Sequence, residues 1–180
     1  MKRLLLILTV ICASVMTTQA QDEKTYHQLC MEYLRLNGSA QQYEDGFDQL
    51  MVMLKRQYKG HPVTKEQWRM LAEQKDEQVL VMHSLLSSVY RRVFDREDLE
   101  KMIGFYSTDT GKKFAADPTN LTEEDRMNLS GYYNSPTGQK LMQGRGELEK
   151  LVAEVSEYWS RDLYKDMTGK LAAMGYKLGE

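Results

Sequence analysis

The side chains with the greatest capacity for chemistry lie in a short stretch near the start of the chain. His27, Cys30 and Met31 fall within five residues, and imidazole, thiolate and thioether groups are soft ligands that suit Cu(I). In the competing interpretation, Cys30 belongs to the hydrophobic core and His27 to the surface. We favour the second interpretation, because the remaining histidines, His61 and His83, are isolated. We therefore predict no metal site and no other cofactor.

Two acidic runs resemble the paired carboxylates of acid–base catalysis. They are Glu97-Asp98 and Glu123-Glu124-Asp125. Each falls in the first turn of an expected helix, where carboxylates stabilise the positive end of the helix dipole. The chain also lacks His-Glu-x-x-His, Gly-x-Ser-x-Gly, a phosphate-binding glycine-rich loop and Cys-x-x-Cys. We therefore predict no enzymatic activity, no catalytic residues and no metal ligands.

Two aromatic pairs are the candidate binding residues, Phe105-Tyr106 and Tyr132-Tyr133. Neighbouring residues on a helix point about 100° apart, so both rings of a pair cannot face the same core. One ring of each pair can pack inward while the other lies at a groove or partner surface, a place that suits tyrosine. In the alternative, all four rings pack between the helices of the repeat described next.

These pairs belong to an internal repeat that must position them. Residues 94–114 and 121–141 align without a gap at an offset of 27 residues. The identical pairs are Glu97/Glu124, Asp98/Asp125, Gly104/Gly131, Tyr106/Tyr133, Thr110/Thr137, Gly111/Gly138 and Lys113/Lys140. Helix N-caps are expected at matching places in both copies: Asp95 and Thr122, then Thr108 and Ser135. We predict a tandem-duplicated helix–turn–helix over residues 94–142, inside a bundle because a repeat array needs more copies.

The second copy carries a more specific motif. It begins with Leu121-Thr122-Glu123-Glu124 and ends with Tyr132-Tyr133-Asn134-Ser135-Pro136-Thr137-Gly138-Gln139-Lys140. With these residues, the segment 93–142 resembles domain-of-unknown-function family 2059, whose members are exported bacterial proteins. The first copy is a degenerate version that lacks the proline, and Arg126 replaces an expected aliphatic residue. The resemblance implies an α-helical, exported bacterial protein; it implies no activity, substrate or catalytic residue.

The rest of the chain also has helical periodicity, so we predict an all-α helical bundle. The clearest apolar stripe comprises Tyr43, Phe47, Leu50, Met51, Leu54 and Tyr58. We expect helix starts at Ser39 and Thr64 and a stop at Asn37-Gly38. Residues 64–93 form either one helix or two. A last long helix is expected over 139–169, with a possible break at Gly144-Arg145-Gly146 and a frayed tail over 169–180.

The N-terminal residues 1–20 have the pattern of a signal peptide. Lys2 and Arg3 precede the apolar run Leu4–Ala13, and small residues at Thr18 and Ala20 predict cleavage after Ala20. A retained anchor or a lipoprotein at Cys12 are the alternatives. We expect 21–180 to form a single domain in the periplasm or outside the cell. Its one cysteine, Cys30, is then either buried or bonded to another molecule.

Composition narrows the class of function. The chain has 180 residues, with 24 Lys+Arg and 26 Asp+Glu. It therefore lacks the excess of positive charge that is typical of proteins that bind nucleic acid. No second hydrophobic segment follows residue 20. The many methionines suit either a pliable contact surface or a helical core, and we favour the core.

We predict an exported, non-enzymatic interaction or binding module with a protein partner in the envelope. The alternatives are a carrier of an apolar small ligand or lipid, which requires an internal cavity, and an enzyme with an unfamiliar site. The identity of the partner, the oligomeric state and the biological process stay open.

Overall fold

The computed structural model describes residues 24–177, so the expected signal peptide lies outside the described residues. Between Lys24 and Lys177 the chain forms helices and no strand, which confirms the all-α prediction. The helices are α1 (Tyr26–Leu36), α2 (Gln41–Gln57), α3 (Lys65–Ala72), α4 (Lys75–Val93), α5 (Arg96–Tyr106), α6 (Asp109–Ala116), α7 (Glu123–Asn134) and α8 (Pro136–Ala173). None of the helices in this range is both long and apolar enough to cross a bilayer.

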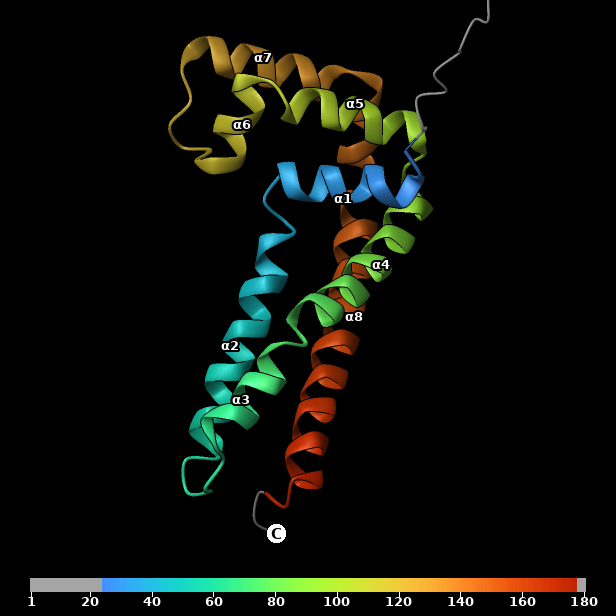
Figure 1. The fold of residues 1–180 in the computed structure, drawn as a ribbon. Helices are drawn as coiled ribbons and strands as arrows, with labels where there is room; N and C mark the ends of the chain where they lie inside the picture. The colour runs from blue at the N-terminus through green and yellow to red at the C-terminus, as the bar shows by residue number, and fades with distance from the viewer. Residues whose placement is uncertain (1–23, 178–180) are drawn as a thin grey trace, which may run out of the picture.

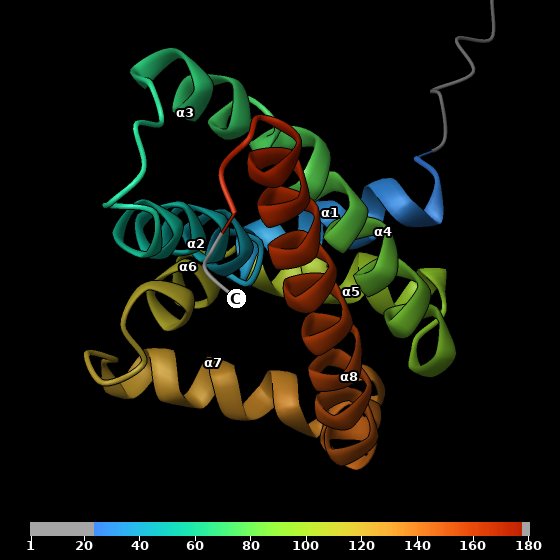
Figure 2. The same cartoon turned by 90° about the horizontal axis from the view of Figure 1, so that it is seen from below.

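The helices form a long arm with a second group laid across one end (Figure 1). Helices α2, α4 and α8 run along the arm, with α3 at its far end. Helix α1 lies against both α4 and α5, and α5, α6 and α7 lie beyond it. Seen from below, α3 and α7 lie at opposite edges of the molecule (Figure 2). The start of α8 packs against α7, so this helix connects the crossing group to the arm.

Local sequence signals set most helix starts. Thr64, Asp95 and Thr122 each accept a hydrogen bond from the backbone N–H three residues on, within a capping box. The expected start at Ser39 is wrong: α2 begins at Gln41, and no side chain caps it. The N–H of Ser39 donates to Asn37 Oδ1 at 2.9 Å, in a turn that the short polar side chain of asparagine stabilises, and Ala40 stands at the N-cap.

The structure answers the question left open over residues 64–93, where α3 and α4 are separate helices. They are separated at Glu73 and Gln74, whose ψ angles of −12° and −2° depart from the helical value. This is the polar stretch of the segment. Without apolar residues it has no stripe that would hold both halves on one straight axis.

Helix α8 is continuous from Pro136 to Ala173, so the expected break at Gly144-Arg145-Gly146 is not found. A Cβ on Gly144 would lie 2.7 Å from Val93 Cγ1. This glycine therefore lets α8 pass close to the end of α4. In the tail expected to fray, α8 continues to Ala173, and the Tyr176 hydroxyl has two acceptors within reach, Pro62 O at 3.2 Å and Gln67 Oε1 at 3.1 Å.

The core follows the predicted apolar stripes. Five residues of the α2 stripe, Tyr43, Phe47, Met51, Leu54 and Tyr58, are buried. Trp159 of α8 lies 5.8 Å from the ring of Tyr43, and its indole N–H donates to Gln78 O at 2.9 Å. The described methionines are buried (Met51, Met82, Met102, Met167), partly buried (Met31, Met174) or exposed (Met53, Met70, Met127, Met142).

Cys30 lies wholly inside the core, as one of the two interpretations predicted. Burial raises the pKa of its thiol to about 12, partly offset by a hydrogen bond with Ser87. A thiol at this position is protonated at neutral pH, and the thiolate is the form that reacts.

Candidate functional site

The two repeat copies make the same turn. In the first copy, the Thr108 hydroxyl donates to Phe105 O at 2.7 Å and accepts from the N–H of Gly111 at 3.0 Å. In the second copy, Ser135 makes the same pair of bonds, at 2.6 Å to Tyr132 O and 3.1 Å from Gly138 N. Both N-caps were expected from the sequence.

A glycine is required at each of these turns. A Cβ on Gly111 would lie 2.2 Å from Phe105 O, and one on Gly138 would lie 2.1 Å from Tyr132 O. Real Cβ atoms do not approach a carbonyl oxygen so closely, and a backbone atom cannot move aside as a side chain can. The second helix of each copy can therefore fold back against the first only because the residue at this position is glycine, which has no Cβ. In the second copy this helix continues as the full length of α8.

The copies then bind each other through two buried carboxylates. Thr110 Oγ1 and Lys113 Nζ of α6 lie 2.9 Å from the two carboxylate oxygens of Asp125 in α7. In the other direction, Thr137 Oγ1 of α8 donates to Asp98 Oδ1 of α5 at 3.2 Å, and Lys140 Nζ donates to Asp98 Oδ2. The same three residue types thus form both contacts, with the roles of the copies exchanged.

These contacts shift the pKa values of their members. The hydrogen bond from Lys113 holds the pKa of the Asp125 carboxyl well below its usual range, and bonds from Thr122 and Thr110 lower it further. Lys113 and Lys140 have raised pKa values, chiefly because each donates a hydrogen bond to its aspartate. A carboxylate held ionised beside a protonated lysine is a poor proton acceptor at neutral pH.

The four candidate binding residues have three different environments. Phe105 and Tyr132 stack face to face, with ring centroids 4.0 Å apart and an interplanar angle of 9°. Tyr106 is buried and meets Tyr33 of α1 edge to face at 5.6 Å. Tyr133 is half-buried, 5.4 Å from the ring of Tyr132. The structure therefore brings Phe105 and Tyr132 together across the copies and places Tyr106 in the core.

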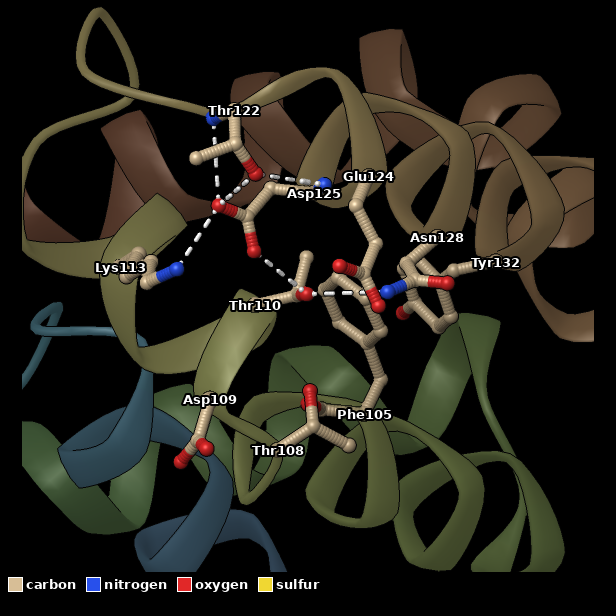
Figure 3. Close-up of a pocket in the computed structure, with 10 residues that line it drawn as sticks. All are labelled: Phe105, Thr108, Asp109, Thr110, Lys113, Thr122, Glu124, Asp125, Asn128 and Tyr132. Atoms are coloured by element: carbon tan, nitrogen blue, oxygen red, sulfur yellow. Dashed lines mark hydrogen bonds and ion pairs between the residues drawn. The ribbon is translucent and has the colours of Figure 1, made fainter.

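The stacked pair forms one wall of a half-open hollow between α6, α7 and the end of α5 (Figure 3). The hollow has a volume of about 790 Å³. Its lining is Phe105, Thr108, Asp109, Thr110, Lys113, Thr122, Glu124, Asp125, Asn128 and Tyr132. Aromatic rings lie on one side, and hydroxyl, amide and charged groups surround the rest. The two rings supply the apolar part of the lining, and the other eight residues are polar or charged.

Tyr132 has one unsatisfied group. Its hydroxyl oxygen is buried and has no hydrogen-bond partner within residues 24–177. Burial raises the pKa of this phenol, and the neighbouring Tyr106 and Tyr133 raise it further. An unpaired buried hydroxyl carries a desolvation cost, and Phe105, the stacked partner, has no such group.

The soft residues near the start of α1 do not come together. His27 and Met31 line an open hollow of about 500 Å³ on the outer side of the helix, and Cys30 is not part of it. In the part of the chain that the structure describes, no three His, Cys, Asp or Glu side chains are placed to hold a metal ion.

The sequence interpretation overlooked most of the hollow's residues. Asp109, Thr110, Lys113, Glu124 and Asn128 lie in it beside the aromatic rings. Three of them, Thr110, Lys113 and Glu124, were visible as identical positions of the repeat. Only the fold shows that Thr110 and Lys113 bind the other copy, through Asp125.

Comparison with known proteins supports the family resemblance over a segment. No curated protein and no solved structure matches the chain. The matching family model extends from the middle of α4 into the first turn of α7. It includes the first repeat copy and ends before Tyr132–Lys140, the stretch that carries the clearest motif. Over residues 81–125 the chain is thus similar, as predicted, to the family described as "Uncharacterized protein conserved in bacteria (DUF2059)".

Proposed function

We propose that the protein is an exported, non-enzymatic binding module of the bacterial cell envelope, and that the hollow between the repeat copies holds its ligand or a partner segment. The observation that carries this proposal is the stacked pair of Phe105 and Tyr132 at the wall of a half-open, polar hollow. Aromatic rings beside hydrogen-bonding groups offer a ligand both an apolar surface and polar atoms to bind.

The charged groups of the hollow support binding over catalysis. Asp125 is 4% exposed and is bound by Lys113 and two threonines. The pKa of Asp125 is lowered and that of Lys113 is raised, so both values move further from neutral pH. Neither group is then suited to exchange a proton at that pH. General acid–base catalysis needs a group whose pKa lies near the working pH.

The lipid-carrier alternative receives less support from this hollow. A lipid chain requires an enclosed apolar cavity, because exposed methylene groups lose the benefit of burial. This hollow is open to solvent, and threonine, asparagine, lysine and carboxylate side chains line it. A polar ligand or an exposed segment of a partner protein fits such a lining better.

The test is a capture experiment with two tryptophan variants. Asn128→Trp fills the hollow, whereas Met127→Trp adds the same ring at a neighbouring position that is 62% exposed. Wild type and both variants, tagged at the C-terminus, are expressed in the native host, crosslinked in the envelope and analysed by mass spectrometry for proteins and small molecules. We expect a molecule that is retained by wild type and Met127→Trp and lost with Asn128→Trp.

Equal retention by all three proteins would refute the hollow as the binding site. The same preparations test export, because N-terminal sequencing of the envelope protein should begin at Gln21. A chain that begins at Met1 would refute cleavage after Ala20.

A further inference from the structure

The end of the arm farthest from the hollow carries a concentration of positive charge. Residues 52–70 cover the last turns of α2, the loop to α3 and most of α3, and they include five Lys or Arg against one Glu. Over the whole chain, acidic residues outnumber basic ones, 26 to 24. Figure 1 shows this segment, the basic end, at the free end of the arm beside the end of α8, with α6 and α7 at the other end of the molecule.

Most of these charges have no counter-charge in the fold. Arg69 is paired with both Glu66 and Glu73. Within residues 24–177, four exposed basic residues of this segment make no ion pair with a carboxylate: Lys55, Arg56, Lys59 and Lys65. The only charge-related contact among these four is that of Lys55, whose Nζ lies 5.9 Å from the ring centroid of Trp68.

Helix stabilisation accounts for only part of this charge. Lys55 and Arg56 lie in the last turn of α2, where the helix dipole favours cations. Lys65, however, is the first residue of α3, where the dipole disfavours a cation. Helix α4 also begins with a lysine, Lys75, and there the charge is paired with Asp48 at 2.8 Å. Because Lys65 has no such partner, its charge is unfavourable for the helix and indicates a role outside the folded chain.

Exposed apolar side chains accompany the charges. Val52 and Met53 of α2 are 49% and 40% exposed, and Met70 of α3 is 49% exposed. Trp68 is half-buried beside them. Indole rings, with an apolar body and a polar N–H, are enriched where a membrane meets water. Lysine side chains suit the same region, because their stems lie along apolar surface while their ammonium groups stay in water.

The loop between α2 and α3 is held in place. The N–H of His61 donates to Tyr58 O at 2.9 Å, and the ring of His61 lies between those of Tyr58 and Tyr176, at 5.4 and 6.3 Å. The hydroxyl of Tyr176 also has Pro62 O within reach. The end of α8 therefore braces the loop, and the charges are presented by a fixed surface.

From these observations we propose that the basic end of the arm binds the surface of a membrane that contains anionic phospholipids. The lysine and arginine side chains pair with the anionic headgroups, and the exposed apolar side chains enter the boundary between headgroups and acyl chains. An acidic protein surface would complement the charges alone, so the exposed valine and methionines beside tryptophan favour lipid. This inference goes beyond the proposed function. With the basic end on the membrane, the hollow lies at the other end of the molecule.

The experiment is sedimentation of mature protein, residues 21–180, with vesicles of phosphatidylcholine that contain or lack phosphatidylglycerol. We expect binding only where phosphatidylglycerol is present. Each Lys or Arg near an anionic membrane strengthens binding about fivefold. The variant with Lys55→Gln, Arg56→Gln, Lys59→Gln and Lys65→Gln should therefore bind at least about a hundredfold more weakly.

A matched control removes the same charge elsewhere. It carries Arg35→Gln, Arg92→Gln, Lys112→Gln and Lys150→Gln, all at exposed positions outside the basic end. This control should bind nearly as wild type does. Because all eight substituted residues are exposed, both variants should fold, which their circular dichroism and melting temperatures check.

A fluorescence measurement tests which end faces the bilayer. Brominated phosphatidylglycerol should quench the fluorescence of Trp68. Trp68→Phe should remove the quenching, since the other tryptophan, Trp159, is buried in the arm.

Soluble polyglutamate separates a membrane from an acidic protein partner. The variant with Val52→Ser, Met53→Ser and Met70→Ser should bind vesicles more weakly and polyglutamate as wild type does. Binding to polyglutamate without binding to vesicles would overturn the membrane assignment in favour of an acidic protein. Equal binding to phosphatidylcholine alone, equal weakening by the control, or no quenching of Trp68 would each overturn it as well. Capture through the hollow depends on other residues, so either proposal can fail while the other stands.

Discussion

Asp98 and Asp125 occupy the same place in the two repeat copies, and each carboxylate is bound by the threonine and lysine of the other copy. Thr110 and Lys113 bind Asp125, while Thr137 and Lys140 bind Asp98. The contact is therefore reciprocal, like that across a two-fold axis. Phe105 and Tyr132, another equivalent pair, stack on each other between these contacts. This exchange gives a physical reason for three of the identities in the repeat.

The threonines of this contact should have similar effects on stability. Thr110→Val and Thr137→Val each remove a hydrogen bond to a buried carboxylate and keep the side-chain shape. We expect each to lower the free energy of unfolding by about 1 to 2 kcal/mol, measured by urea denaturation. If one variant is destabilised and the other is unaffected, the two contacts are not equivalent.

Acid should weaken the contact at Asp125. Its carboxyl has a lowered pKa in the folded protein, whereas the unfolded value is about 3.9. The stabilisation is therefore complete above the unfolded pKa and is lost as the pH falls toward the folded one. The melting temperature of wild type should drop from about pH 5 downward. In Asp125→Asn the melting temperature is lower at neutral pH and falls less with acid; an unchanged slope would contradict this assignment.

The two turn glycines should not tolerate alanine. In Gly111→Ala and Gly138→Ala the new methyl group meets a carbonyl oxygen at 2.2 and 2.1 Å. We expect each variant to lose about 3 kcal/mol or more of unfolding free energy. Gly104 and Gly131 are the matched controls, because they are also equivalent in the repeat and have open space at the Cβ position.

Alanine at the control sites should stabilise the protein by roughly 0.5 to 1 kcal/mol, since glycine in a helix costs backbone entropy. Thermal and urea denaturation of the four single variants measure both effects. A tolerated alanine at Gly111 or Gly138 would show that the turn can open.

The unsatisfied hydroxyl of Tyr132 predicts an unusual substitution. Tyr132→Phe removes a buried oxygen that has no hydrogen-bond partner in the described part of the chain. The ring and its stack with Phe105 remain. We expect a gain in unfolding free energy of up to about 1 kcal/mol, and a fold that is unchanged by NMR. Loss of stability would mean that the hydroxyl has a partner in solution, such as an ordered water molecule.

Cys30 should be unreactive in the folded protein. Its side chain is 0% exposed and its pKa is raised to about 12. A thiol reagent such as Ellman's reagent, applied at pH 8, should react only when the protein unfolds, with a rate that follows the opening of the core. Rapid modification of the native protein would contradict burial. It would also reopen the alternative of a bond to a second molecule.

Much of the helical fold could be predicted from local signals. The stripe from Tyr43 to Tyr58 and the caps at Thr64, Asp95, Thr108, Thr122 and Ser135 depend on residues within a few positions of one another. The start expected at Ser39 is wrong because the turn at Asn37 carries the chain to Ala40 before α2 begins. The break expected in α8 is wrong because of a distant contact: the helix continues through Gly144, which lies against Val93 of α4.

By itself, the sequence determined the all-α class and the 27-residue pattern of identities, because these depend on periodicity and on residue types along the chain. Burial of Cys30 was one of two alternatives that it left open. The sequence also singled out Phe105 and Tyr132 as candidate binding residues. The tertiary structure alone decided that these rings stack, that Asp98 and Asp125 bind across the copies, and that both rings line a hollow whose other residues are polar or charged. Each of these relationships joins atoms that lie far apart along the chain, and how the copies pack against each other sets the distance between them.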